Sequence, residues 1–275
     1  MTVANPATPT GSPADAPAAG KRKESWSESL RVLLIYVLCF LGIRTFLFEP
    51  YNIPSASMVP TLQVGDYLFV NKFAYGYSRF SLPFSPDLFD GRIFFSAPHR
   101  GDVAVFRFTK DTSIDYIKRI VGLPGDTIQV REGELYLNGK LVPRKPIGDY
   151  TGIDENRNQL PGKLYDETLP SPRAGAPDHT VTHRILKLTD LGDANNTPVY
   201  TVPQGYFFAM GDDRDDSADS RFQGDAPEDL GYVPMQNLVG RATILFFSWD
   251  AAHPWYEFWY WPVEVRWSRL LHMVH

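Results

Sequence analysis

The sequence predicts a mainly β protein: an antiparallel β-sheet domain with a smaller, loop-rich β insertion, preceded by one N-terminal transmembrane helix. Three observations predict this class. Short runs of β-branched and aromatic residues, bounded by Gly, Pro or Asp, recur from about Asp66 to Trp249. They do not alternate with helical segments as in βαβ units, so an antiparallel sheet is expected. One long apolar segment, from Val32 to Phe48, precedes them all.

Composition narrows the class of protein further. The 275 residues are 43% hydrophobic and 14% aromatic, which suits a packed core. The net charge of −5 provides no basic surplus to neutralise phosphates, so a nucleic-acid partner is not expected. Cys39 is the sole cysteine, which excludes an intramolecular disulfide.

Residues 29–48 are predicted to form a membrane anchor, and residues 1–28 a disordered tail rich in Ala, Pro, Thr, Gly and Ser. Lys21, Arg22 and Lys23 precede the apolar run, so the positive-inside rule places the N-terminus in the cytoplasm. Residues 49–275 then lie across the membrane. A cleaved signal peptide is the competing interpretation. No small-x-small pair ends the run, so an uncleaved anchor is favoured.

The strand pattern is regular on both sides of a less regular stretch, residues 143–198, which is rich in Pro, Gly, Asp and Asn. We interpret that stretch as the loop-rich insertion. Asn138-Gly139 between two apolar runs predicts a hairpin with a type I′ turn. The other expected strands cover residues 67–70, 103–108, 127–130, 184–188 (within the insertion), 199–202, 206–210 and 242–249.

Ser57 lies only nine residues beyond Phe48, at most about 30 Å of extended chain. A serine nucleophile needs a base within hydrogen-bond reach. The six histidines stand in no recognisable catalytic or metal context, so neither a Ser-His-Asp triad nor zinc is expected. The remaining base for a serine is a lysine made neutral by burial.

Lys118 is the candidate for that base. On a strand, Lys118 and Arg119 point to opposite faces, and both faces are apolar, so strand periodicity does not choose between them. Acid–base chemistry favours Lys118 as the base, because arginine stays protonated whereas burial lowers the pKa of a lysine. The plain alternative is a lysine that extends to water beside a strand.

The acidic stretch of residues 211–221 is the third candidate. It lacks the central glycine and final glutamate of an EF-hand, so calcium is not expected. The sequence allows Ser217 to orient a neutral lysine amine, and allows Asp219 and Arg221 to pair and stiffen the loop. A solvated acidic loop is the alternative.

Four segments in this order resemble the bacterial type I signal peptidase family: residues 53–62 (IPSASMVPTL), 100–103 (RGDV), 116–126 (YIKRIVGLPGD) and 211–221 (GDDRDDSADSR). The resemblance covers roughly residues 30–130 and 200–245. It implies that Ser57 is the nucleophile and Lys118 the general base. It further implies that Ser55 belongs to the oxyanion hole, that Ser217 positions the lysine, and that Asp219 and Arg221 are structural support.

The resemblance also implies a set of residues that line the substrate pockets. These residues are Tyr51, Ile53, Pro54, Met58, Leu62 and Ile117. The chain departs from the family at Asp213 and Asp216, where members commonly have Asn. The added negative charge is expected to raise the pKa of Lys118.

The expected function is therefore that of a membrane-anchored Ser/Lys endopeptidase that removes signal peptides from exported preproteins. The expected location is the bacterial inner membrane, with one span and the catalytic domain outside the cytoplasm. Its expected partners are signal peptides and membrane lipid, without cofactor, metal or nucleic acid. Two alternatives are another Ser/Lys peptidase of related fold, such as a self-cleaving repressor, and a non-enzymatic anchored β module.

Residues 262–275 are predicted to form an amphipathic helix. Pro262 suits a first helical turn, and an apolar stripe of helical period follows it. The stripe consists of Val263, Trp267, Leu270, Leu271 and Val274. Two interpretations remain open: the helix packs on the β domain, or it lies with the nearby tryptophans in the lipid interface.

Overall fold

A computed structural model describes residues 26–154, 156–250, 252–253 and 256–274. Most of the predicted N-terminal tail lies outside these residues. The chain forms two compact units, one that ends at Phe40 and one that runs from Leu41 to His275. Helix α1, Trp26–Phe46, is long and apolar enough to cross a membrane. Its hydrophobic side chains are exposed, as expected of a helix that meets lipid rather than a protein core.

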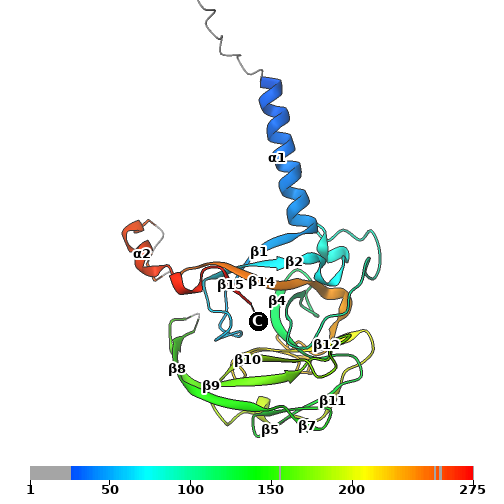
Figure 1. The fold of residues 1–275 in the computed structure, drawn as a ribbon, viewed down its shortest axis with the longest axis vertical. Helices are drawn as coiled ribbons and strands as arrows, with labels where there is room; N and C mark the ends of the chain where they lie inside the picture. The colour runs from blue at the N-terminus through cyan, green and yellow to red at the C-terminus, as the bar shows by residue number, and fades with distance from the viewer. Residues whose placement is uncertain (1–25, 155, 251, 254–255, 275) are drawn as a thin grey trace, which may run out of the picture. The chain divides into compact units, whose positions relative to one another are not determined.

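The second unit is mainly β and antiparallel, which confirms the predicted fold class (Figure 1). Its main sheet has the order β1-β2-β14-β3-β4-β12-β13, and β15 pairs with β14. The bounds are β1 (Phe48–Asn52), β2 (Asp66–Asn71), β3 (Val103–Arg107), β4 (Asp115–Gly122), β12 (Tyr206–Met210), β13 (Val233–Pro234), β14 (Leu238–Ser248) and β15 (His272–Met273).

A second sheet has the order β11-β5-β6-β7 and packs its own apolar cluster around Ile128 and Leu135. The predicted hairpin is present, because Leu137 of β6 pairs with Lys140 of β7. Asn138 and Gly139 between them have φ of 53° and 73°, as a type I′ turn requires. The bounds are β5 (Thr127–Arg131), β6 (Glu134–Leu137), β7 (Lys140–Leu141) and β11 (Tyr200–Thr201).

The insertion forms a third antiparallel sheet, in the order β10-β9-β8. Its strands are β8 (Arg144–Ile153), β9 (Gln159–Pro170) and β10 (Thr180–Lys187). They are longer than the composition suggested. β8 is an edge strand, and its Pro146 and Gly148 flank a shift of register. Proline lacks a backbone N–H and glycine has a flexible backbone, so both are tolerated at such a position.

The C-terminal helix predicted over residues 262–275 is wrong. α2 covers only Trp261–Glu264, a 3₁₀ turn follows at Trp267–Arg269, and β15 then pairs with β14. Two arginines explain the difference. The guanidinium groups of Arg266 and Arg269 both form ion pairs with the buried Asp66. These ion pairs hold the segment against the sheet. A helix this short is marginal in water, so these tertiary contacts prevail over periodicity.

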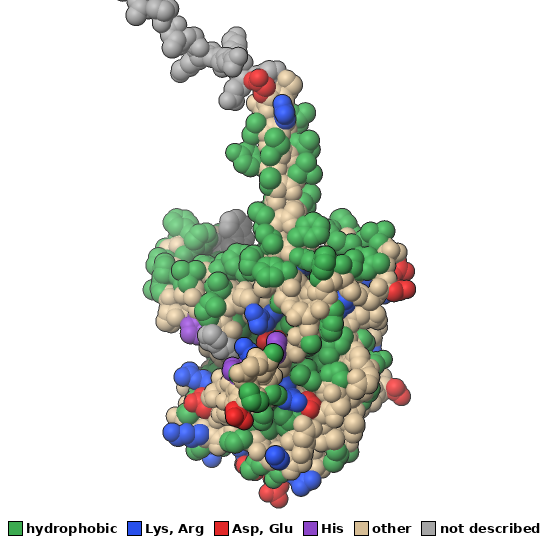
Figure 2. Space-filling model, turned by 45° about the vertical axis from the view of Figure 1, so that its right-hand side comes forward, with side chains coloured by type: hydrophobic (Ala, Val, Ile, Leu, Met, Phe, Trp, Pro, Cys, Tyr) green, Lys and Arg blue, Asp and Glu red, His purple; other side chains and the backbone are tan. Residues whose placement is uncertain are grey.

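Exposed hydrophobic side chains gather at the end of the second unit that carries β1 and α2 (Figure 2). Charged side chains are more frequent toward the opposite end (Figure 2). The large exposed side chains near these elements are Phe48, Tyr67, Phe69, Phe73, Phe258, Trp259, Trp261 and Val263. An apolar surface of this kind on a soluble domain marks an interaction site.

Candidate active site

Ser57 lies in the segment that connects β1 to β2. Two backbone bonds close the base of this segment: Ile53 N–H donates to Asp66 O (2.9 Å) and Gly65 N–H donates to Ile53 O (3.0 Å). Met58 is fully buried in the core, which anchors the chain directly after the serine. Ser57 itself is 8% exposed, so its hydroxyl lies at a cleft rim with a defined orientation.

Lys118 reaches Ser57 from the main sheet. It lies on β4 opposite Ala104 of β3, and its side chain is almost entirely buried. Its Nζ donates to Ser57 Oγ at 2.5 Å. Burial lowers the pKa of Lys118 to about 8, although the nearby Asp219 opposes this effect. The neutral amine that results at mildly alkaline pH can accept the serine proton.

Ser55 lies beside Ser57 and is exposed to solvent. Its Oγ is 3.4 Å from Ser57 Oγ, at the limit of a hydrogen bond, and its side chain is exposed. A hydroxyl in this place can turn toward an oxyanion that forms next to Ser57. The predicted role of Ser55 therefore has a suitable geometry.

The loop of residues 211–221, here called the support loop, forms another part of the site. Asp219 and Arg221 form the predicted pair, with Arg221 Nη2 donating to Asp219 Oδ2 at 2.8 Å. Burial alone would raise the pKa of Asp219, but the Arg221 guanidinium holds it below its usual value. Asp219 Oδ2 also accepts Gly211 N–H (2.9 Å), so one carboxylate joins both ends of the loop.

Ser217 is less directly placed than predicted. Its side chain is buried, and its Oγ has no hydrogen-bond partner among the described residues. Ser217 nevertheless lies close to Ser57, because a Cβ added at Gly211 would collide with Ser217 Oγ and with Ser57 O (2.5 Å). The role of Ser217 in orienting the Lys118 amine therefore stays a prediction.

The two aspartates expected to act on Lys118, Asp213 and Asp216, differ in position. Asp216 is exposed, lines the cleft and raises the pKa of Lys118, as expected. Asp213 is buried, and its Oδ1 accepts the N–H groups of Asp215 (3.2 Å) and Asp216 (3.0 Å). Burial raises the pKa of Asp213 to about 7. Asp213 is not among the charges that act most on Lys118, so the expected effect is supported for Asp216 alone.

Ser57 and Lys118 open onto a cleft of about 380 Å³. Of the six predicted substrate-pocket residues, Pro54 and Ile117 line it. Ile53, Met58 and Leu62 are buried in the core, and Tyr51 packs against the same cluster. Their contact with substrate stays a prediction. The cleft also uses residues not singled out from the sequence: Ala56, Ile114, Asp115, Tyr116 and Ala218. Strand alternation signalled two of these, because Ile114 and Tyr116 share a face with Lys118.

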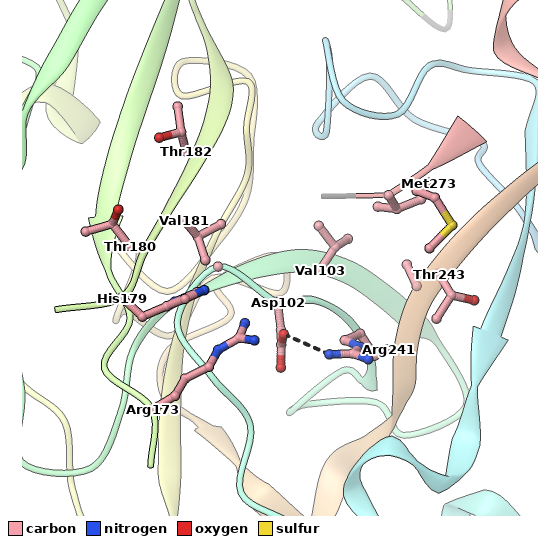
Figure 3. Close-up of a pocket in the computed structure, with 13 residues that line it drawn as sticks. Asp102, Val103, Arg173, His179, Thr180, Val181, Thr182, Arg241, Thr243 and Met273 are labelled. Atoms are coloured by element: carbon pink, nitrogen blue, oxygen red, sulfur yellow. Dashed lines mark ion pairs between the residues drawn. The ribbon is translucent and has the colours of Figure 1, made fainter. Parts of the chain in front are cut away.

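A separate hollow of about 420 Å³ lies where β10 faces β14 and β15 (Figure 3). Asp102 and Arg241, which both line it, form an ion pair with Nη1 and Oδ1 3.5 Å apart. Neither Ser57 nor Lys118 lines this hollow. The chemistry expected of the chain is therefore concentrated in the other cleft.

Comparison with known proteins identifies the family. A family model described as "Signal peptidase, peptidase S26" matches residues 26–249. The chain belongs to the signal peptidase I family. A signal peptidase I from Pseudomonas aeruginosa is 42% identical over 214 residues, which cover 76% of this chain and 68% of the relative. One from Rickettsia typhi is 39% identical over 229 residues, covering 78% and 80%.

The solved structure of a signal peptidase I from Enterococcus faecalis V583 covers 53% of this chain and 97% of its own, with 24% identity and a TM-score of 0.29. The family match confirms the resemblance first drawn from four short segments. It also confirms that the chain is a serine endopeptidase, and it excludes the non-enzymatic β module.

Proposed function

We propose that this protein is a membrane-anchored Ser/Lys endopeptidase that cleaves signal peptides from exported preproteins at the membrane surface. The observation that carries the proposal is the 2.5 Å contact between Lys118 Nζ and Ser57 Oγ. Burial keeps the pKa of that amine near 8, within the range in which a base is useful. Family membership supports signal peptides as the substrate class.

The chemistry follows from this contact. Neutral Lys118 accepts the proton of Ser57, whose Oγ attacks the scissile carbonyl and forms a tetrahedral intermediate. The Ser57 N–H and the Ser55 hydroxyl are placed to donate to its oxyanion, each contributing about 3 kcal/mol. Protonated Lys118 then donates to the leaving amine, and an acyl-enzyme remains on Ser57. Lys118, neutral again, activates the water that releases the peptide.

The substrate binds as an additional strand in this proposal. β12 pairs with β4 only from Arg119 to Gly122, so no described strand pairs with Asp115–Lys118 on that side. This free stretch of backbone lines the cleft beside Ser57. An extended peptide that pairs there presents its carbonyl to Ser57, with main-chain bonds for affinity and side-chain pockets for specificity.

Asp216→Asn should lower the apparent pKa of the enzyme, because Asp216 is one of the carboxylates that raise the pKa of Lys118. More of the amine is then neutral at pH 7, and cleavage at that pH should rise about twofold, a modest gain since Asp216 is exposed. The pH dependence of kcat/KM measures this. Asp111→Asn, a similarly exposed carboxylate in the loop before β4, is the control. An unchanged or raised apparent pKa for Asp216→Asn would contradict the electrostatic argument.

The topology in this proposal is a single span in the bacterial inner membrane, with the basic residues before α1 in the cytoplasm and the second unit outside. The aromatic residues near α2 then meet the lipid interface, where such rings are favoured. Lipid contact, the second interpretation of the C-terminal segment, is therefore retained, although the segment does not form the predicted helix over residues 262–275.

A spin label at position 259 tests lipid contact. In reconstituted Trp259→Cys, with Cys39→Ser, the label should collide more with oxygen than with a water-soluble nickel chelate. Leu191→Cys, at a still more exposed position in the insertion, should give the opposite order. If both labels favour the nickel chelate, the aromatic segment lies in water.

The experiment that tests the function itself uses the full chain reconstituted in vesicles, with one purified preprotein. The wild type should shorten the preprotein and leave a new N-terminus at a single bond, whereas Ser57→Ala should leave it intact. Cleavage by Ser57→Ala would exclude Ser57 as the nucleophile. Absence of cleavage by both proteins, with several preproteins, would overturn the proposed function.

A further inference from the structure

The support loop lies between the nucleophile and the insertion. On one side, Asp213 N–H donates to the carbonyl oxygen of Ser57 (3.2 Å). On the other, Leu186 N–H of β10 donates to Asp212 O (2.8 Å), and Arg214 N–H donates to Leu186 O (3.0 Å). Leu186 and Asp213 thus form a parallel bridge, which adds the loop to the edge of the insertion's sheet. The backbone next to Ser57 is therefore continuous, by hydrogen bonds, with β10.

Buried ion pairs reinforce this junction. Arg214 binds the carboxylate of Glu167 on β9 with two N–H groups, one at 2.9 Å, and both side chains are buried. The next residue, Asp215, accepts from Lys187 Nζ of β10 at 2.6 Å, and these side chains are also buried. Because an unpaired charge at such a place is costly, each pair holds the loop in one register against the insertion.

Apolar contacts attach the nucleophile segment itself to the insertion. Ala56 and Val59, on either side of Ser57, form one buried cluster with Leu160 of β9 and Leu186 of β10. The insertion thus supports Ser57 in two ways: directly through this cluster and indirectly through the support loop. A sheet used only as a spacer would not require buried charges at that contact.

We propose that Glu167 and Lys187 of the insertion are positioning residues for the Ser57–Lys118 pair, acting through Arg214 and Asp215 of the support loop. The inference rests on the proposed Ser/Lys function. It assigns to the insertion a part in the reaction: its sheet is the rigid backing against which the nucleophile and its base are held at hydrogen-bond distance.

The effect on chemistry follows from what surrounds Lys118. The charged groups that act most strongly on it, Asp219, Arg221, Asp212 and Asp216, all belong to the support loop. When the loop loses its backing, water reaches the amine. Desolvation is the largest influence on Lys118, so its pKa rises toward that of a free lysine. The distance to Ser57 Oγ also loses its constraint, which lowers the rate of the chemical step.

Lys187→Met in the full-length, reconstituted protein tests the proposal. We expect kcat to fall by about 10- to 100-fold with KM nearly unchanged, and the alkaline rise of kcat to move to higher pH. Lys187→Arg should retain most of the activity. Adding Asp215→Asn to Lys187→Met should cost little more, because the two residues act as a unit. Lys163→Met is the matched control: Lys163 is exposed on β9 and pairs in register with Lys187, whereas the side chain of Lys187 is buried against Asp215.

Active-site titration separates positioning from folding. If kcat per titrated site is normal and only the number of sites falls, Lys187 has a structural role alone and the proposal is overturned. It is equally overturned if kcat and the pH profile of Lys187→Met match those of Lys163→Met. In the wild type, Leu188 N–H donates to Asp215 Oδ2 at 2.8 Å. Should Lys187→Met fail to fold, Asp215→Asn decides by the same criteria, because the amide oxygen of Asn can accept that N–H. Wild-type cleavage in the same assay shows whether the function holds independently.

Discussion

Lys118→Arg should be as inactive as Lys118→Ala, with at least about a 1,000-fold loss of preprotein cleavage. Arginine preserves the positive charge and the reach of the side chain, but it cannot give up a proton to become a base at any pH the protein survives. Cleavage should be measured with a preprotein at several pH values. In the wild type, activity should rise through about pH 8, where Lys118 becomes neutral.

Lys140→Arg, on an exposed hairpin position, controls for the substitution itself and should leave cleavage unchanged. Substantial activity in Lys118→Arg would mean that position 118 serves as a fixed positive charge. In that case another group must take the serine proton. A wild-type profile that is flat from pH 6 to 10 would contradict the same mechanism independently, because it would show that no titration of the lysine limits the rate.

The largest expected loss of stability is that of Asp212→Ala. Asp212 accepts two N–H groups of Arg119, at 2.8 and 2.6 Å, and neither side chain has appreciable contact with water. Removing the carboxylate leaves the buried guanidinium charge without its ion-pair partner, which should lower the free energy of unfolding by about 3–5 kcal/mol. Urea unfolding of the detergent-solubilised protein, followed by tryptophan fluorescence, measures this loss.

Asp87→Ala is the matched control, because its pair with Arg79 is solvent-exposed and should contribute nothing measurable. A similar, small effect of both substitutions would show that water enters the Arg119 site. Asp212→Asn should be less harmful than Asp212→Ala, since its amide oxygen still accepts one N–H of Arg119. This order distinguishes the loss of a charge from the loss of a hydrogen-bond acceptor.

The neighbours Lys118 and Arg119 show where sequence reasoning reached its limit. Both faces of their strand are apolar, so alternation alone could not say which side chain meets Ser57. Acid–base chemistry selected Lys118, and the structure brings it to 2.5 Å from Ser57 Oγ. The structure also explains why Arg119 is buried: it forms an ion pair with Asp212 on the opposite face of the sheet.

Two predictions depended on distant contacts and fared less well. The C-terminal apolar stripe had helical period. The ion pairs of Arg266 and Arg269 with Asp66 instead hold the segment in a 3₁₀ turn followed by a short strand. Ser217 matched a family motif, yet its hydroxyl makes no bond to Lys118 among the described residues. Periodicity and motif spacing describe local order. They contain no information about which distant charge will arrive beside a given residue.

By itself, the sequence determined the fold class, the single apolar span, the family, and the candidate pair Ser57 and Lys118. Each of these depends on local pattern or on residue types whose chemistry is the same in any surroundings. Only the tertiary structure decided how the insertion is used. Glu167 and Lys187 are ordinary charged residues in a Pro- and Gly-rich stretch, and folding buries them against Arg214 and Asp215 beside the nucleophile. The interaction energy of such charges depends on how deeply they are buried, and burial is a property of the folded chain as a whole.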